Sequence, residues 1–363
     1  MECYLHIGAA KAGSTALQRW CAESRSSLRG QGVWYPKCLG KVNHTLLWAV
    51  AADANSNEHH LAGLGIYSDE VRKKMRLRIE HEFERERAQN EGCRACIVSN
   101  EYLQSRMRFM SEVQRVYDFL APHFTSIKVV LSLRPQVDVA VSRASTTCRR
   151  AKRVNTNTFL RSVNPENPGY DYDTLVKQWE RVWGRSNVTV VPYKREPSLV
   201  AYFIKRLELD SAVLPPDARR NEALDYRAIA LANGLIEARV LSAEEIRRCV
   251  MKTPVEKRLQ IGRAFAQMLQ SRFEDKNRRL SERRQDIEVD DLTPDWSRYE
   301  LKGNLHVLDQ KCAYTQQLSN ILRGLLTESK GGQRRVTAHA HERCESRGRV
   351  VCNVTRKAVP SAD

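Results

Sequence analysis

The sequence predicts an α/β fold in which a central parallel sheet is flanked by helices. Short, mostly apolar runs alternate with longer segments of helical spacing, and this alternation is typical of such folds. None of the apolar runs contains Pro or Gly, as expected of strands that are covered on both faces. The strand candidates are Cys3–Ile7, Ala95–Ser99, Ile127–Leu133 and Val188–Val191.

Helices are expected between and around these strands. One begins at about Thr15, directly after the first strand and a short loop. A charged helix is expected over Asp69–Asn90, where apolar residues recur every four positions. Two more are expected, at Asp138–Cys148 after the third strand and at Asp173–Trp183 before the fourth.

Residues 1–215 form the predicted core, and the chain is long enough to bury a full core without disulfide or metal staples. An insertion at about 30–92 interrupts this core. Its first half, which carries Trp34, Tyr35, His44 and Trp48, is expected to be a lid or an acceptor-binding insertion.

The rest of the chain reads differently. Residues 216–330 are expected to be a mainly helical C-terminal part of the same domain, with a long basic helix at about Val255–Gln285. Residues 331–363 are polar, basic and without periodicity, and are expected to be a disordered tail.

Composition restricts the class of protein. Sixty Lys and Arg against 43 Asp and Glu leave a formal charge of +17, and such a surface attracts polyanions. No apolar run approaches the roughly 18 residues of a membrane-spanning helix, and no secretory signal is visible. We therefore expect a cytoplasmic protein without a membrane span.

Ten cysteines are scattered through the chain, unlike those of a small disulfide scaffold, and reduced thiols are expected. The single CxxC pair, Cys93 and Cys96, lacks the second pair that a zinc site needs. The tail residues His339, His341, Cys344 and Cys352 match no zinc spacing either. No metal site is predicted.

The loop after the first strand is the most informative part of the sequence. Between His6 and Gln18, Gly8 and Gly13 permit a tight backbone that leads straight into a helix. Successive backbone N–H groups and a helix N-terminus then converge on one point, which favours a phosphate. The candidate binding residues are Lys11, Ala12, Gly13, Ser14, Thr15 and Ala16.

This loop departs from the P-loop of nucleotide triphosphatases, GxxxxGK[ST]. Gly8 and Gly13 have the right spacing, but Ser14 stands where the lysine is required, and the lysine is Lys11 instead. P-loop enzymes also hold magnesium with an Asp that closes a neighbouring strand. No Asp follows the second strand, and the third ends at Arg134, so the loop predicts a phosphate site without a metal.

A second phosphate site is predicted at Arg134. Pro135 stops the third strand, Asp138 is expected to cap the next helix, and Ser142 follows Arg134 by eight residues. Ligands of open α/β sheets lie at the carboxyl ends of the strands, so Arg134, Ser142 and the first loop should face one crevice. An arginine fork with a hydroxyl suits a phosphate.

Together the two motifs resemble the sulfotransferase family that uses 3′-phosphoadenosine 5′-phosphosulfate (PAPS). The first loop is similar to the family's 5′-phosphosulfate motif, commonly PKxGTT, with Ala10 for Pro and Ser14 for the first Thr. Arg134 and Ser142 match the 3′-phosphate motif, including its spacing. The resemblance covers about residues 1–205.

The resemblance implies transfer of a sulfuryl group from PAPS, as co-substrate and without a metal, to a hydroxyl or amine of an acceptor. Lys11 would stabilise the charge that develops on the leaving phosphate. The general base would be Glu101, at the end of the second strand, or His44, in the insertion. The expected acceptor is a carbohydrate, with a small molecule as the alternative.

Two other functions stay open at this point. A nucleotide or small-molecule kinase with a degenerate P-loop would need the lysine after Gly13 and the metal-binding Asp, and both are missing. A non-catalytic protein could bind polyanions through the basic helix and tail. Aromatic residues are not interleaved there as in single-strand binders, so nucleic acid is not the expected partner.

Overall fold

The computed structural model describes residues 1–8, 11–53, 58–196, 198–213, 223–239 and 241–310. Its centre is a parallel sheet with the strand order β2-β3-β1-β4-β5. The strands are β1 (Glu2–Gly8), β2 (Val33–Trp34), β3 (Ala95–Ser99), β4 (Ser126–Leu133) and β5 (Val188–Pro192). Four of them match the predicted runs within one residue at each end, and the α/β prediction is confirmed.

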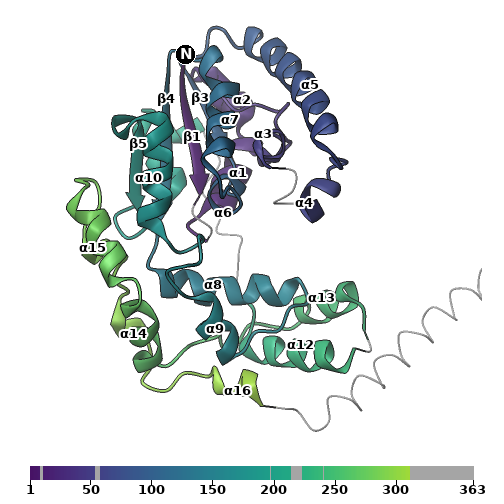
Figure 1. The fold of residues 1–363 in the computed structure, drawn as a ribbon, viewed down its shortest axis with the longest axis vertical. Helices are drawn as coiled ribbons and strands as arrows, with labels where there is room; N and C mark the ends of the chain where they lie inside the picture. Colours follow the sequence, from purple (N-terminus) through teal and green to yellow (C-terminus); the bar gives the residue numbers. More distant parts are fainter. Residues whose placement is uncertain (9–10, 54–57, 197, 214–222, 240, 311–363) are drawn as a thin grey trace, which may run out of the picture.

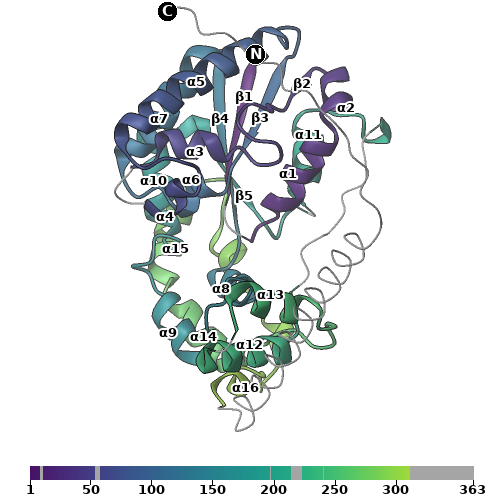
Figure 2. The ribbon, with the colours of Figure 1, turned by 90° about the vertical axis from the view of Figure 1, so that its right-hand side faces the viewer.

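Helices cover both faces of the sheet (Figure 2). One face carries α1 (Ser14–Glu23), α2 (Arg25–Gly30) and α11 (Leu199–Arg206). The other carries α3 (Thr45–Ala51), α5 (Asp69–Ala88), α7 (Met110–Leu120) and α10 (Tyr172–Trp183). Side chains alternate along β1, so Tyr4 packs in the cluster of the first face and Leu5 in that of the second. Both faces are therefore buried, as the apolar strands predicted.

The expected lid is part of the core instead. Trp34, Leu47 and Trp48 are buried in the same cluster as the strands, with 3%, 0% and 0% of their surface exposed. Trp34 lies in β2, which pairs with β3 at the edge of the sheet and went unpredicted because it has only two residues. The large aromatic side chains of this segment are therefore structural.

A second helical layer lies beyond the carboxyl ends of the strands (Figure 1). It is built on its own cluster of buried apolar residues. Its helices are α8 (Gln136–Arg149), α9 (Thr156–Ser162), α12 (Tyr226–Ala238), α13 (Ala243–Met251), α14 (Arg263–Ser271) and α16 (His306–Asp309). The helices α4 (Glu58–Ala62), α6 (Tyr102–Ser105) and α15 (Glu274–Glu282) complete the described α-helices. Among all the helices of the described residues, none is long and apolar enough to cross a bilayer.

The predicted long helix at 255–285 is wrong. Residues 254–262 are not helical, and two separate helices follow, α14 and α15. Gly262 caps α14 with an extended backbone, so a new helix begins after it. Phe273, between α14 and α15, is fully buried in the apolar cluster of the second helical layer, and the chain turns there.

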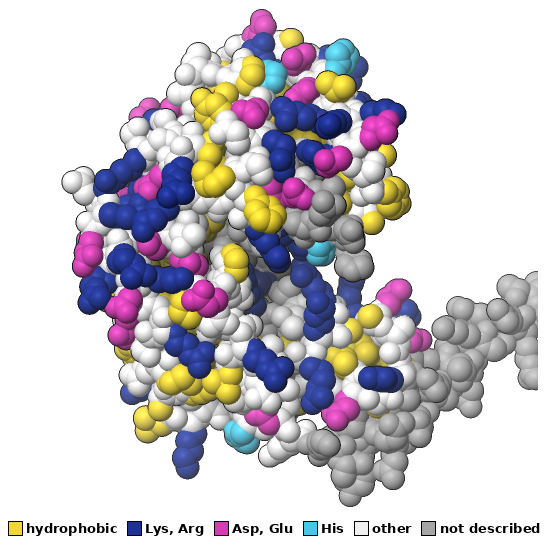
Figure 3. Space-filling model, in the orientation of Figure 1, with side chains coloured by type: hydrophobic (Ala, Val, Ile, Leu, Met, Phe, Trp, Pro, Cys, Tyr) yellow, Lys and Arg dark blue, Asp and Glu magenta, His cyan; other side chains and the backbone are white. Residues whose placement is uncertain are grey.

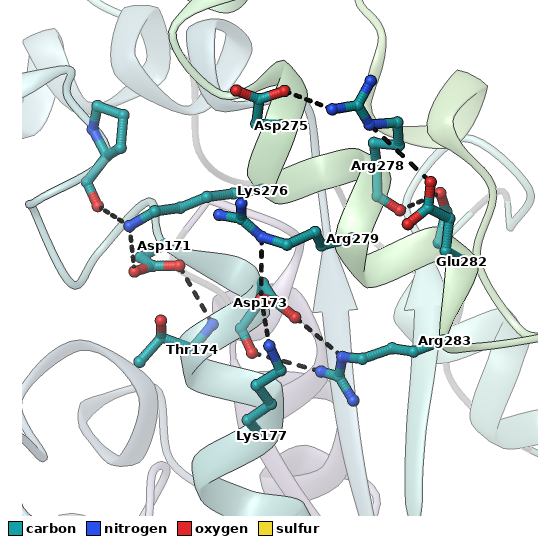
Figure 4. A network of polar contacts seen from close by, with 12 residues as sticks. Asp171, Asp173, Thr174, Lys177, Asp275, Lys276, Arg278, Arg279, Glu282 and Arg283 are labelled. Carbon is teal, nitrogen blue, oxygen red and sulfur yellow. Dashed lines mark hydrogen bonds and ion pairs between the residues drawn. The ribbon is translucent and has the colours of Figure 1, made fainter.

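Ion pairs join α15 to α10 (Figure 4). The buried carboxylate of Asp173 lies 2.9 Å from Arg283 Nε and 2.8 Å from Lys177 Nζ. Lys276 Nζ lies 2.6 Å from Asp171. These contacts hold the C-terminal helices against the helix that precedes β5. The predicted tail, with His339, lies outside the described residues.

Candidate functional site

The loop after β1 has the backbone expected of an anion cradle. Gly8, Lys11 and Gly13 have φ values of 113°, 69° and 94°, in the left-handed region that normally favours glycine. Lys11 is a strained exception, and such strain persists only where the surrounding structure imposes it. Helix α1 begins at Ser14, and its cap residue, Gly13, has no side chain to bond the first N–H groups. A helix start of this kind suits an anion.

The other predicted residues of this loop differ in exposure. Ala12 is fully buried and Ser14 is 2% exposed, whereas Thr15 and Ala16 are half-buried. Leu199 of α11 packs 3.7 Å from the position that a Cβ at Gly13 would take. The C-terminal end of the loop, at Gly13, thus packs against α11.

The second predicted phosphate residue lies beside this loop. Arg134, directly after β4, donates from Nη1 to the backbone oxygen of Lys11 over 3.4 Å. Because β1 and β4 are neighbouring parallel strands, their carboxyl ends bring Lys11 and Arg134 to one edge of the sheet. Ser142 is half-buried on α8, the helix that starts two residues after Arg134.

Asp138 has a different role from the helix cap that was expected. Helix α8 starts at Gln136 with Pro135 at its cap position. The Asp138 carboxylate lies 3.4 Å from Arg134 Nε and accepts a hydrogen bond from the Tyr299 hydroxyl. The structure thus holds Arg134 in place from the C-terminal part of the chain.

Tyrosines complete the surroundings of Arg134, and no sequence pattern pointed to them. The Tyr172 hydroxyl donates to the Arg134 backbone oxygen over 2.9 Å. The Arg134 guanidinium lies 5.0 Å from the ring centroid of Tyr193, which follows β5. Burial, followed by the Asp138 charge, raises the pKa of Tyr299 far above its usual value, so its hydroxyl stays protonated and can donate.

Glu101 follows β3, a parallel neighbour of β1, so it lies at the edge of the sheet that carries Lys11. It occupies the cap position of α6, but its side chain makes no capping hydrogen bond. Burial lowers the pKa of the Lys11 ammonium, and the Glu101 carboxylate raises it in part. A carboxylate thus lies at the same edge of the sheet as the candidate phosphate site.

His44 is a structural residue in this fold. It is fully buried, and its Nδ1 atom accepts from the backbone N–H of Ser99 over 3.0 Å. Its Nε2 atom lies 2.9 Å from the backbone oxygen of Pro36 and donates to it. Burial lowers the pKa of His44 to about 3. Both ring nitrogens are thus engaged by backbone groups, which favours a structural role over that of a base.

A buried polar group behind the loop was also missed by the sequence analysis. His6 Nδ1 lies 2.8 Å from Ser99 Oγ, and Gln18 Nε2 donates to the same hydroxyl over 3.3 Å. These bonds tie α1 to β1 and β3 below the Lys11 loop. The alternation of β1 placed His6 on the α1 side, but nothing in the sequence indicated its partners.

The described cysteines are free thiols, and Cys93 and Cys96 are buried. Within the described ranges, no three His, Cys, Asp or Glu side chains gather as the ligands of a metal would.

Comparison with known proteins gives one match. Neither a model of a protein family nor a curated protein sequence matches the chain. Among solved structures, a sulfotransferase from Alicyclobacillus acidocaldarius is similar, with 15% identity and a TM-score of 0.40, over 69% of this chain and 96% of that chain.

Proposed function

We propose that this protein is a PAPS-dependent sulfotransferase. The observation that carries the proposal is the junction of the two predicted phosphate motifs, in which Arg134 contacts the backbone of Lys11 at one edge of the sheet. A doubly phosphorylated adenosine needs one cation site for each end of the nucleotide. The sequence motifs supply these two sites, and the parallel order of β1 and β4 supports their convergence.

In this proposal, the Lys11 loop would bind one end of the donor, and Arg134 with Ser142 would bind the other. The left-handed backbone at Gly8, Lys11 and Gly13, with the uncapped start of α1, fits the 5′-phosphosulfate. Arg134 and Ser142 would bind the 3′-phosphate, with Asp138 fixing the guanidinium. These residues would distinguish PAPS from nucleotides without a 3′-phosphate.

In the proposed reaction, a hydroxyl or amine of the acceptor attacks the sulfur atom in line with the bond to the 5′-phosphate. The new bond to sulfur forms as the bond from sulfur to the phosphate oxygen breaks. The electron pair leaves with adenosine 3′,5′-bisphosphate, whose developing charge Lys11 stabilises. The Glu101 carboxylate takes the proton of the acceptor.

The test is a comparison of nucleotide affinities. Calorimetry should show that adenosine 3′,5′-bisphosphate binds much more tightly than AMP. In Arg134→Ala, about two charge-assisted hydrogen bonds are lost, at a cost of roughly 3–5 kcal/mol. The affinity for the bisphosphate should therefore fall on the order of a hundredfold or more, and the preference over AMP should disappear.

Arg195→Ala is the matched control, because Arg195 follows the neighbouring strand β5 but is bound by Asp291 at 2.6–2.7 Å. It should leave both nucleotide affinities nearly unchanged. Equal affinity of the parent protein for the bisphosphate and AMP would overturn the assignment. Strict magnesium dependence of turnover would favour a kinase.

A further inference from the structure

The guanidinium of Arg134, which the proposed function assigns to the 3′-phosphate, is only partly engaged by the protein. Its Nε atom lies 3.4 Å from Asp138 Oδ2, and its Nη1 atom donates to the backbone oxygen of Lys11 over 3.4 Å. Within the part of the chain that the structure describes, no further hydrogen bond joins this guanidinium to the protein. An arginine has more N–H donors than these two contacts use, so most of its outer N–H groups bond no described residue.

Arg195 shows how an arginine and a carboxylate pair fully in this fold. This arginine follows β5, the strand beside β4, and its Nε and Nη2 atoms lie 2.7 Å and 2.6 Å from the two oxygens of Asp291. Two short, parallel bonds are the geometry that these groups favour. Asp138 makes a single, longer contact with Arg134 instead. The difference points to another contact of Asp138.

That contact is the hydroxyl of Tyr299. It donates to Asp138 Oδ1, the oxygen that does not contact Arg134. The carboxylate is thus shared between the tyrosine and the arginine, with one oxygen for each. If Oδ1 were released, a second bond to Arg134 would compensate the charge of Asp138 best, as at Arg195. That bond would take up an outer N–H group of the Arg134 guanidinium.

The position of Tyr299 is set by the C-terminal part of the chain. Its backbone oxygen accepts from Arg263 Nε over 3.1 Å, and its ring centroid lies 5.6 Å from that of Trp296. Its side chain packs against the apolar cluster of the second helical layer. The hydroxyl therefore reaches Asp138 from a fixed support, and the surroundings of Arg134 depend on a residue far along the chain.

The general charge of this region does not provide selectivity for a 3′-phosphate. Figure 3 shows Lys and Arg side chains in the hollow between the sheet-containing part and the second helical layer. A positive field of this kind attracts every nucleotide, with or without a 3′-phosphate. Discrimination requires donors at fixed positions, since an arginine recognises a phosphate through paired N–H groups. The direction of the Arg134 guanidinium therefore matters more than the amount of charge around it.

We infer that Tyr299 is a positioning residue for recognition of the 3′-phosphate: its hydroxyl holds one oxygen of Asp138, and this keeps the outer N–H groups of Arg134 from a second bond to that carboxylate. The inference rests on the proposed function. It gives a role in donor specificity to a residue outside the two phosphate motifs. Tyr299 itself does not touch the donor and acts only through Asp138 and Arg134.

The experiment titrates adenosine 3′,5′-bisphosphate and AMP into the full-length parent protein and into Tyr299→Phe. The matched control is Tyr4→Phe, because the Tyr4 hydroxyl also donates to a carboxylate, that of Glu2, over 2.6 Å, but in the amino-terminal half of β1. A third variant, Asp138→Asn, removes the charge that competes for Arg134. It is measured alone and in combination with Tyr299→Phe.

In Tyr299→Phe, the affinity for the bisphosphate should fall roughly tenfold, as expected for the loss of one charge-assisted hydrogen bond. The affinity for AMP should stay within about twofold, since AMP has no 3′-phosphate for Arg134 to bind. In the Asp138→Asn background, Tyr299→Phe should lower the bisphosphate affinity by less than about twofold, because the two residues act as one unit. Tyr4→Phe should change neither affinity by more than about twofold, because it lies away from Arg134.

Three results would overturn the inference: an unchanged bisphosphate affinity in Tyr299→Phe, equal losses for both nucleotides, or the same loss in the Asp138→Asn background. Equal losses are what a merely structural role would give, because a disturbed fold weakens the binding of both nucleotides alike. The parent protein tests the proposed function separately. If it binds the bisphosphate no more tightly than AMP, the proposed function fails; if it prefers the bisphosphate and Tyr299→Phe keeps that preference, only the role of Tyr299 is wrong.

Discussion

Two arginine-rich regions of this molecule differ in the groups that lie against their guanidinium groups. In the first, which we call the anchor, Arg283 and Arg284 meet the carboxylates of Asp173, Glu180 and Asp286. In the second, the Lys11 edge, Arg106 and Arg143 lie over aromatic rings. The anchor has matched its cations with acids of the same chain, as a structural contact does. At the Lys11 edge, the described neighbours of Arg134 include both the Asp138 carboxylate and the Tyr193 ring.

The difference also shows in burial. The Arg284 side chain is 7% exposed, and besides its carboxylates it donates to the backbone oxygen of Val188 over 2.6 Å. Burying a guanidinium is tolerated only where such partners compensate. At the Lys11 edge, Arg150 is exposed and Lys11 is half-buried. We therefore expect substitutions in the anchor to change stability and substitutions at the edge to change activity.

The largest effect is expected for Lys11→Ala. Loss of a preorganised cation at the leaving group should lower the rate of sulfuryl transfer by roughly a thousandfold. The melting temperature should stay within about 2 °C of the parent, because a half-buried residue with a left-handed backbone contributes little packing. Turnover with labelled PAPS and a thermal melt are the two measurements. Near-normal turnover would remove Lys11 from the mechanism.

The second prediction concerns the anchor. Arg284→Ala removes the arginine that pairs with Asp286 and one of the two that pair with Glu180, so unfolding should become easier by about 3 kcal/mol. Arg278→Ala, on α15 shortly before Arg284, is the control, because its pair with Asp275 is exposed and should contribute less than about 1 kcal/mol. Urea unfolding measures both changes.

The affinity of folded Arg284→Ala for adenosine 3′,5′-bisphosphate should equal that of the parent. A loss of nucleotide affinity with unchanged stability would erase the distinction between the two regions.

The strands and the Lys11 loop were predictable because their signals are local. An apolar run without Pro or Gly defines β3 to the residue, and Gly8 and Gly13 predicted the tight backbone that the loop adopts. Arg134 was predictable as a strand-end residue, and the parallel order of β1 and β4 then placed it beside Lys11.

The rest depends on contacts between distant parts of the chain. Tyr299 reaches Asp138 across 161 positions, and no spacing rule connects them. Phe273, between α14 and α15, is buried in the apolar cluster of the second helical layer. Helical periodicity in the sequence does not predict this burial. The charge pattern also could not show which arginines pair with acids, so the anchor and the Lys11 edge looked alike in the sequence.

The smallest effect is expected at His44, which lies below the Lys11 edge but belongs with the structural residues. The pKa of His44 is about 3 in the folded protein, against 6.5 for an ordinary histidine. A lowered histidine pKa means that the unfolded chain binds the proton more readily. The stabilising contribution of neutral His44 is therefore complete above about pH 6.5 and is lost as the pH falls toward 3.

His44→Gln keeps an acceptor for the Ser99 N–H and a donor for the Pro36 oxygen, and it removes the titrating group. Its free energy of unfolding should fall less steeply between pH 6.5 and pH 4 than that of the parent, as urea titrations at a series of pH values would measure. At pH 7.5 its rate of sulfuryl transfer should stay within about threefold of the parent, since no proton moves through this buried ring. A loss of activity as large as that of Lys11→Ala, with an intact fold, would show that His44 is a functional residue and again a candidate for the base.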